Sequence, residues 1–451
     1  MKSALTRRWA ALGVAAGLAL SLAACSSADS GSTGSSSAAA APSSAAAPVT
    51  SSAAEPVTIT LTWWGGDARH ERTQQVIDAF EAKYPNITVE PEYTDWNGYW
   101  DRLATETAGG NSPDVIQMDM MYLASYAGRG ALYDLSSVSS LDLTTLDSTL
   151  LGMGTYDGGQ YAIPMSATSW AILVNTDLLG QLGLSLPDTE TWTWDEFEDF
   201  ALSITTASGG TVHGTGPQIN AYSLDLWARA HGDATFSGGD ITIKPETVAS
   251  YFQLALDWSK SGAMPTAEQY AETATAALDQ SDFALGKLAM IFTQSTQGAA
   301  YAQAANANVQ LVKIPTDDAN STKYAYLKPG MYWSISSQTK HPEEAGLLIN
   351  FIENDPAAAA ILGTERGIPA NPAMVDAIQG SLTDAEKQAV AYAESLASVI
   401  GPAPEITPNG ASAIDTALTR YLQDVLFETS TPLVAAQAFI DEIHQGIEAA
   451  Q

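Results

Sequence analysis

The segment 57–118 constrains the fold most, because strand patterns and helix patterns alternate along it. Residues 57–64 alternate with a period of two, which indicates a strand, and Gly65-Gly66 ends it. A helix is predicted next, with Arg69 near its start and an apolar stripe from Val76 to Tyr84. A strand from Ile87, a helix at 96–108 and a short strand at 115–118 follow it. This β-α-β-α-β order predicts an open, largely parallel sheet.

The carboxyl ends of these strands are the expected place for a ligand, as in other open α/β sheets. Trp63 shares one face of the first strand with the other apolar residues, whereas Trp64 falls on the opposite face. The stretch from Trp64 to Asp67 and the single residue Asp119 lie just past strand ends. These positions are the first candidates for a binding site.

The first 56 residues are not expected to belong to the folded part of the chain. Residues 1–24 have a basic start and an apolar run, which predicts a signal peptide. The sequence up to Cys25 resembles the bacterial lipoprotein box, which implies that Cys25 is lipidated. Residues 26–56 are mostly Ser, Ala, Gly, Thr and Pro and predict a disordered linker with a span of roughly 30 Å. The 395 residues from 57 to 451 suffice for about two domains.

The charge of the chain excludes several partners. Lys and Arg number 19 against 51 Asp and Glu, a formal net charge of −32. Such a surface disfavours nucleic acid and anionic lipid, both of which need cations. The acidity does not by itself identify a ligand.

The motifs of common enzymes and cofactor sites are absent from the sequence. No Gly-x-Ser-x-Gly elbow, phosphate-binding loop, calcium loop or metal-spaced histidine pair occurs. One cysteine cannot form an intrachain disulfide. We therefore expect no cofactor, no metal and no catalytic residue, although spacing alone leaves a catalytic carboxylate pair open.

Several tryptophans have a structural interpretation. Thr193 and Glu196 have the spacing of a capping box, with Trp192 and Phe197 at its hydrophobic staple positions. A helix should begin at Pro245 and end near Gly262, with Trp258 on its apolar face. We assign five tryptophans to structure: Trp96, Trp100, Trp192, Trp194 and Trp258.

The sequence resembles the bacterial extracellular solute-binding proteins of the carbohydrate-uptake, maltose-binding-like class, which are lipoprotein receptors of ABC importers. Four collinear stretches carry the resemblance, and they lie within 63–89, 108–135, 161–197 and 286–370. They include Trp63-Trp64-Gly65-Gly66, Asn111-Ser112-Pro113-Asp114-Val115, Tyr161-Ala162-Ile163-Pro164 and Gly367-Ile368-Pro369-Ala370. Their order and spacing together are more specific than any one of them.

The resemblance implies an α/β, two-lobed periplasmic-binding-protein-like fold. Each lobe would be a mostly parallel sheet flanked by helices, with the ligand cleft between the lobes. We expect the chain to cross near Pro164 and Pro315 and to return after Gly367. Lobe one would comprise 57–164 and 316–368, and lobe two 165–315 and 369–451.

The resemblance also implies a function without catalysis. The chain would capture a mono- or oligosaccharide and deliver it to the permease subunits of an ABC transporter. It would be a monomer on the extracellular face of the cell membrane, held there only through its lipid. Two alternatives stay open: a receptor of the same fold for a peptide, polyamine or osmolyte, and a secreted glycoside hydrolase.

A sugar site needs flat aromatic surfaces for the C–H faces and polar groups for the hydroxyls. On this ground and from the resemblance we select ten candidates: Trp64, Asp67, Arg69, Asp119, Trp170, Trp227, Gln294, Tyr332, Trp333 and Arg366. Arg69 is unusual because a cation at a helix start is mildly unfavourable. Arg366 could bind a hydroxyl pair or brace Asp119.

Overall fold

The computed structural model describes residues 55–274, 276–318 and 322–450. The predicted signal peptide, Cys25 and nearly all of the linker lie outside these residues. The expectations for that part of the chain therefore stay predictions.

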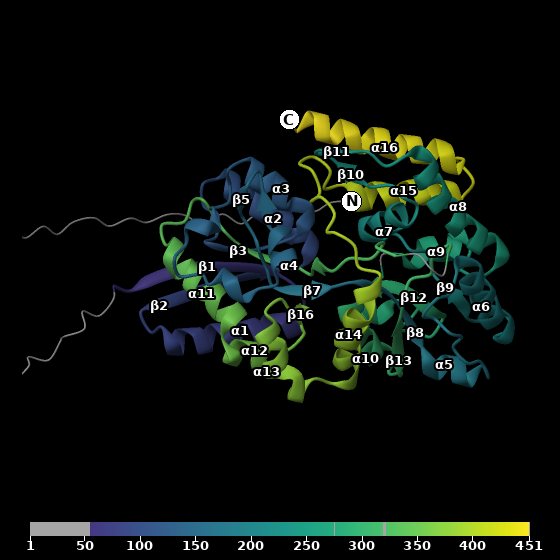
Figure 1. The fold of residues 1–451 in the computed structure, drawn as a ribbon, viewed down its shortest axis with the longest axis horizontal. Helices are drawn as coiled ribbons and strands as arrows, with labels where there is room; N and C mark the ends of the chain where they lie inside the picture. Colours follow the sequence, from purple (N-terminus) through teal and green to yellow (C-terminus); the bar gives the residue numbers. More distant parts are fainter. Residues whose placement is uncertain (1–54, 275, 319–321, 451) are drawn as a thin grey trace, which may run out of the picture. The chain divides into compact units, whose positions relative to one another are not determined.

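Five strands form the first sheet, in the order β2-β1-β3-β15-β6 (Figure 1). They are β1 (Val57–Trp64), β2 (Ile87–Thr94), β3 (Val115–Met118), β15 (Tyr332–Ile335) and β6 (Ile163–Pro164). Strand β1 is parallel to β2 and β3, and α1 (Asp67–Lys83) and α2 (Trp96–Ala108) connect them. The predicted β-α-β-α-β order is confirmed, and β15 adds antiparallel pairings with β3 and β6.

The two faces of β1 belong to two different cores. Ile59, Leu61 and Trp63 pack in a cluster with α1 and with α11 (Pro342–Asn354). Trp64 packs on the opposite face, in a cluster with Tyr99 of α2. Helices α11 and α12 (Pro356–Leu362) lie beside α1, although α1 ends at Lys83 and α11 begins only at Pro342. The period-two pattern thus located both faces of the strand.

The second sheet has the order β13-β8-β12-β9. Its strands are β8 (Trp170–Asn175), β9 (His213–Thr215), β12 (Leu288–Gln294) and β13 (Val309–Val312). Only β12 and β9 pair in parallel, while β8 is antiparallel to both of its neighbours. The sheets are therefore mixed rather than mostly parallel. The periodicity of a strand does not encode its direction, which explains the difference.

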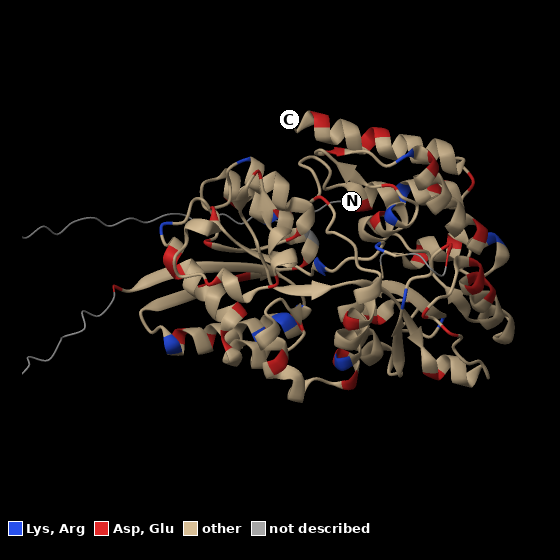
Figure 2. Ribbon diagram, viewed as in Figure 1, with Lys and Arg blue, Asp and Glu red and all other residues tan. Residues whose placement is uncertain are grey.

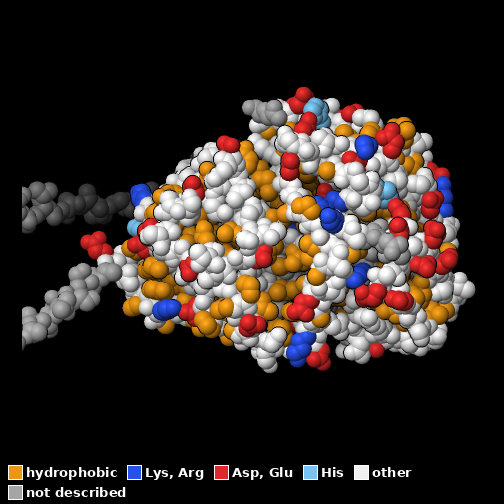
Figure 3. Space-filling view, viewed as in Figure 1, with side chains coloured by type: hydrophobic (Ala, Val, Ile, Leu, Met, Phe, Trp, Pro, Cys, Tyr) orange, Lys and Arg blue, Asp and Glu red, His pale blue; other side chains and the backbone are white. Residues whose placement is uncertain are grey.

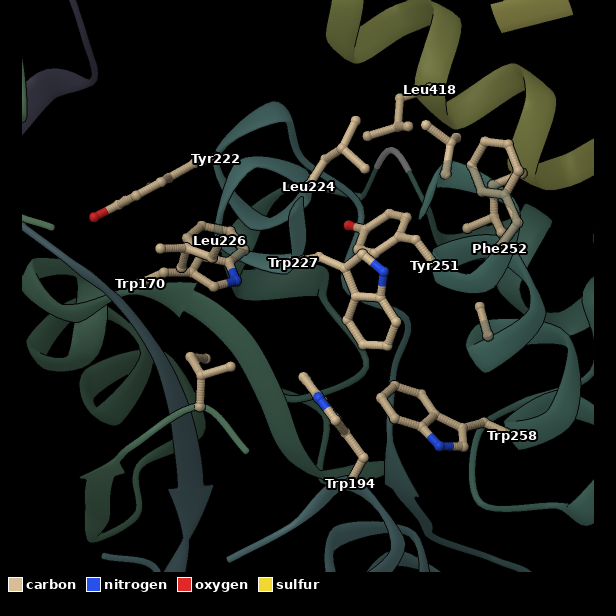
Figure 4. Close-up of a cluster of buried hydrophobic side chains, with 14 of the residues drawn as sticks. Trp170, Trp194, Tyr222, Leu224, Leu226, Trp227, Tyr251, Phe252, Trp258 and Leu418 are labelled. Atoms are coloured by element: carbon tan, nitrogen blue, oxygen red, sulfur yellow. The ribbon is translucent and has the colours of Figure 1, made fainter. Parts of the chain in front are cut away.

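The largest core of the described chain lies over the second sheet. It joins the aromatic side chains of Figure 4 to α6 (Trp194–Ala207), α7 (Ala221–Ala230), α8 (Pro245–Ser261), α15 (Ile414–Leu426) and α16 (Pro432–Ala449). The capping box of Thr193 and Glu196 is present at the start of α6, and Trp192 contacts Phe197 with ring centroids 5.3 Å apart. Trp258 is fully buried in this core, as predicted.

The other helices and strands flank these sheets. The helices are α3 (Met120–Gly128), α4 (Ser148–Gly152), α5 (Thr176–Gln181), α9 (Ala267–Thr273), α10 (Gly298–Ala305), α13 (Pro372–Ile378) and α14 (Asp384–Ser395). Two hairpins are formed by β4 (Thr155–Tyr156) with β5 (Gly159–Gln160) and by β10 (Phe236–Ser237) with β11 (Asp240–Ile241). None of the described helices is long and apolar enough to cross a membrane.

A third, small sheet joins the two larger ones. It consists of β14 (Lys328–Pro329), β7 (Ser166–Thr168) and β16 (Ile368–Pro369), with β7 in the centre. We call it the connecting sheet, because β7 links β6 to β8 and β14 links β13 to β15. Tyr326 packs in the core of the second sheet. The lobe boundaries stay a prediction, and this contact favours a second crossing nearer Lys328 than Pro315.

Candidate functional site

A cavity of about 740 Å³ lies against residues of all three sheets. The first sheet and its helices contribute Trp64, Arg69, Trp96, Asp119, Met120, Met121 and Tyr122. The second sheet and its helices contribute Asn220, Ala221, Tyr222, Asp225, Arg229, Phe236, Gln294, Gln297, Asp415 and Thr416, among others. Lys328, Gly330 and Met331 line it at and beside the connecting sheet. This is the size range of small-molecule binding sites.

Three aromatic rings form one wall of the cavity. Trp64 is the last residue of β1, and Trp96 and Tyr122 follow β2 and β3. The rings of Trp64 and Trp96 meet edge to face with centroids 4.9 Å apart. Tyr122 stacks on Trp100 at 3.7 Å and 17°, so the buried Trp100 supports this wall from behind. Rings held by other rings offer flat apolar surface at little cost in side-chain entropy.

The facing aromatic groups come from the second core and the segment before the connecting sheet. The Tyr222 hydroxyl donates to the Tyr326 carbonyl at 2.6 Å. The Lys328 ammonium lies 5.9 Å from the centroid of the Tyr222 ring, and the Arg229 guanidinium lies 5.0 Å from that of Tyr326. Both cations are held over aromatic faces, which attract them electrostatically.

Two carboxyl groups, the buried Asp225 and the half-buried Asp415, line the same cavity. Asp225 on α7 is 8% exposed, and burial raises its pKa. The pKa of Asp415 at the start of α15 is also raised by burial, although its Oδ1 accepts a hydrogen bond from the Ala221 amide at 2.6 Å. Water solvates the charged form of these carboxyls poorly, so hydroxyl donors from a ligand would be strong partners for them.

The charges on the cavity wall are nearly balanced. The lining includes three cations, Arg69, Arg229 and Lys328, and four carboxyl groups, Asp119, Asp225, Glu405 and Asp415. Elsewhere acidic residues outnumber basic ones, and they occur on many helices and loops in Figure 2 and at many points of the face shown in Figure 3. The strong net charge of the chain is therefore not a property of its cavity.

Four of the ten predicted residues line this cavity: Trp64, Arg69, Asp119 and Gln294. Asp119 is also the N-cap of α3, since its Oδ1 accepts from the Met121 amide at 2.9 Å. Gln294 ends β12 beside the connecting sheet. The structure brings these four side chains together from three chain segments.

The other six predicted residues do not line the cavity. Asp67 is exposed in the first turn of α1. Trp170 and Trp227 pack in the core over the second sheet (Figure 4), and Trp227 donates to the Thr247 carbonyl at 3.2 Å. Tyr332 and Trp333 are 0% and 1% exposed, because β15 is an interior strand with both faces covered.

Arg366 is buried behind the cavity and does not brace Asp119. Its guanidinium bonds Gln117, Thr73 and Glu365 instead. Local sequence patterns could not indicate these partners, because they come from β3, α1 and the loop before β16.

Several residues that line the cavity were not among the predicted site residues, and Trp96 is the most important of them. We assigned Trp96 to structure, yet its side chain is 37% exposed and lines the cavity. The position of Trp96 in the sequence could have indicated this role. Trp96 follows β2, and the carboxyl end of β2 lies beside that of β1, because Trp64 pairs with Thr94. Tyr122, Tyr222, Asp225, Lys328 and Asp415 were also missed.

A second, more open cavity of about 500 Å³ adjoins the first. The segment Ala403–Glu405 lines both cavities. Tyr156 and Asp157 of the β4–β5 hairpin line the second one. Across the described residues, no cluster of three or more His, Cys, Asp or Glu side chains is arranged to hold a metal ion.

This geometry is that of a binding protein: two sheets with their helices, and a partly open cavity lined by residues of both. Residues 75–391 match the family described as bacterial extracellular solute-binding protein. The chain belongs to this family. The predicted fold class is confirmed by solved structures of the same fold.

Among those structures is an extracellular solute-binding protein of family 1 from Alicyclobacillus acidocaldarius. It is 26% identical, with a TM-score of 0.67 and coverage of 87% of this chain and 99% of that one. A periplasmic oligogalacturonide-binding protein from Yersinia enterocolitica, in complex with saturated digalacturonic acid, is 24% identical, with a TM-score of 0.76 and the same coverage.

The similarity to curated relatives is partial. The diacetylchitobiose-binding protein DasA of Streptomyces coelicolor is 30% identical over 141 residues, which cover 31% of this chain and 32% of that protein. The chain spans about a third of the length of the curated relatives that it matches.

Proposed function

We propose that the chain is the carbohydrate receptor of an ABC importer. It captures a mono- or oligosaccharide in the 740 Å³ cavity and delivers it to membrane permease subunits. The protein acts as a monomer on the extracellular face of the membrane, where a lipid on Cys25 anchors it. The proposed lobes close on the ligand by a hinge motion.

The observation that carries this proposal is the composition of the cavity wall. Trp64, Trp96 and Tyr122 offer aromatic faces on one side. On the other side, Asp225 and Asp415 offer carboxyl groups whose pKa is raised by burial. A pyranose ring has both a C–H face and a rim of hydroxyls, so it matches both kinds of surface. The name of DasA, a diacetylchitobiose-binding protein, supports the same class of ligand.

The balance of charge in the cavity favours a neutral ligand over a polyamine. Three cations line the wall together with four carboxyl groups, so a polycation would meet repulsion as well as attraction. Binding of a neutral sugar should hardly change between low and high salt, whereas polyamine binding should weaken strongly.

A thermal-shift screen of the full chain tests the proposal. The panel is diacetylchitobiose, maltose, cellobiose, glucose, spermidine and glycine betaine. A ligand at 100 times its Kd stabilises the folded state by about 2.7 kcal/mol. Roughly 400 residues that unfold together have an unfolding entropy of about 0.8 kcal/mol/K, so the expected rise in Tm is about 3 °C.

Calorimetric titration at two salt concentrations then identifies the ligand class. Trp64→Ala should lose binding, while Trp192→Phe, which alters a buried ring remote from the cavity wall, should keep it. A flat response to every sugar, with a response to spermidine, would replace the proposal by the polyamine alternative. New reducing ends after incubation with oligosaccharides would favour the hydrolase.

A further inference from the structure

A closed circuit of hydrogen bonds lies directly behind the aromatic wall of the cavity. Its first member is the Trp64 carbonyl, which accepts from Arg69 Nη1 at 3.0 Å and from Gln117 Nε2 at 3.4 Å. Arg69 Nε donates to Glu365 Oε1 at 2.7 Å. The segment before β16 thereby reaches a residue of the cavity wall.

Arg366 closes this circuit. Its Nη1 donates to Glu365 Oε2 at 3.3 Å and its Nε donates to Gln117 Oε1 at 3.2 Å. Its Nη2 donates to Thr73 Oγ1 at 2.8 Å, which ties the circuit to α1. The circuit thus runs from Trp64 through Arg69, Glu365, Arg366 and Gln117 and back to Trp64.

The side chains of the circuit are largely buried. The Arg366 side chain is 5% exposed, and desolvation lowers its pKa to about 10, so it keeps its charge at neutral pH. The side chains of Arg69 and Glu365 are 14% and 16% exposed. Removing one partner from such a network leaves the others buried and unpaired, which is costly.

The circuit borders the cavity on one side, because Trp64 and Arg69 both line the cavity. The packing beside the cavity is close: a Cβ atom on Gly65 would lie 2.4 Å from Arg69 Cδ. Arg69 therefore folds back over the Gly65-Gly66 turn toward Trp64. A ligand that touches the Trp64 ring or the Arg69 guanidinium would act on this turn directly.

On its other side, the circuit contacts the connecting sheet through Arg366. The Arg366 carbonyl accepts from the Ser166 hydroxyl of β7 at 2.5 Å, and β16 begins two residues later. A Cβ atom on Gly330 or Gly367 would lie 2.6 Å from Ser166 Oγ, so the backbone is closely packed around this bond. A shift of Arg366 therefore cannot leave the connecting sheet unchanged.

We propose that Glu365 and Arg366 are positioning residues that couple the occupancy of the cavity to the geometry of the connecting sheet. They hold Arg69 against the cavity wall and transmit its displacement to β7 and β16. This inference rests on the proposed function only in its ligand arm. Neither residue lines the cavity, so both act through Arg69 and Trp64.

The chemistry of Arg366 explains why a lysine would not replace it. The planar guanidinium donates to Glu365, Gln117 and Thr73 from fixed directions, and it also lies 5.7 Å from the centroid of the Trp333 ring. A lysine ammonium is a single point on a flexible stem and cannot hold the same three partners in plane. Arg366→Lys keeps the charge and removes the geometry.

The first experiment measures the distance between the two lobes without any ligand. Spin labels are placed at Ala82→Cys on α1 and Asp199→Cys on α6, both exposed, in the full chain carrying Cys25→Ser. Arg366→Lys and Glu365→Gln should each broaden the distance distribution or shift it by more than about 2 Å. Arg72→Lys is the matched control on α1, since Arg72 bonds the Leu362 carbonyl outside the circuit.

The second arm uses diacetylchitobiose, with calorimetry for affinity. Arg366→Lys should weaken its binding about 5- to 150-fold, the usual range of coupling between sites, while Arg72→Lys leaves it unchanged. If Arg366→Lys and Glu365→Gln give the wild-type distance distribution, the coupling is refuted. If no sugar binds the wild type, the proposed function loses its support, while the ligand-free distances still decide the coupling.

Discussion

Two tryptophans provide the sharpest test of the site, because sequence and structure assign them opposite roles. Trp227 was predicted to contact the ligand and Trp96 to be structural. In the structure Trp96 lines the cavity, whereas Trp227 is 6% exposed and packs against Trp194 with ring centroids 5.5 Å apart. The variants Trp96→Ala and Trp227→Ala should therefore fail in different assays.

The stability of the two variants follows from burial. Truncation of a buried tryptophan costs about 3–5 kcal/mol, so Trp227→Ala should lower Tm by about 4–6 °C at an unfolding entropy near 0.8 kcal/mol/K. Trp96 keeps 37% of its surface exposed, so Trp96→Ala forfeits less burial, about 1–2 kcal/mol and 1–3 °C. Differential scanning calorimetry measures both values.

Affinity should change in the opposite order. Trp96→Ala removes an aromatic face from the cavity and should weaken sugar binding by about 1–2 kcal/mol, or about 5- to 30-fold. Trp227→Ala, measured well below its Tm, should bind within about threefold of the wild type. A Trp227→Ala protein that folds at wild-type Tm but loses the sugar would refute the assignment of the cavity.

Three further predictions concern the fold. Asp225→Asn should stabilise the protein progressively as pH rises from about 4, because the raised pKa of buried Asp225 makes the folded state bind its proton more tightly than the unfolded chain. Tm measured across pH 4–8 should show the gap between variant and wild type widen and then level off, and a constant gap would contradict this. Thr193→Ala removes the capping box of α6 and should cost about 1 kcal/mol in urea unfolding, with Ser replacing Thr as the conservative control. Gly214→Ala would place a Cβ 2.2 Å from the Ala201 carbonyl oxygen and should lower Tm sharply, while Gly66→Ala, with no atom within 4 Å of its Cβ, should not.

The elements with strong local patterns were predictable from the sequence. The helix predicted at 96–108 is α2 (Trp96–Ala108), and the strand predicted at 115–118 is β3 (Val115–Met118). Pro245 opens α8 and Gly262 closes it in a left-handed conformation, as the cap residues indicate. Each of these features depends on residues close in sequence, which is why local reasoning found them.

The buried aromatic residues of β15 show where local reasoning fails. Tyr332 and Trp333 were selected from the family resemblance, shortly after a Pro-Gly pair, but β15 lies between β3 and β6 in the first sheet and buries both. The burial of a strand depends on neighbours that are remote in sequence, here more than 200 residues away for β3. No pattern within residues 329–335 carries that information.

The two walls of the cavity differ in how far a general rule could predict them. Trp64 ends β1, and Trp96 and Tyr122 follow β2 and β3. These three strands are parallel to one another, so their carboxyl ends meet at one edge of the first sheet. Strand order alone would have found all three. In the second sheet β8 is antiparallel to β12 and β13, so carboxyl ends point to both edges and define no single binding edge. One strand end, Gln294 of β12, reaches the cavity. The starts of α7 and α15 bring Tyr222 and Asp415 to the same wall through tertiary packing.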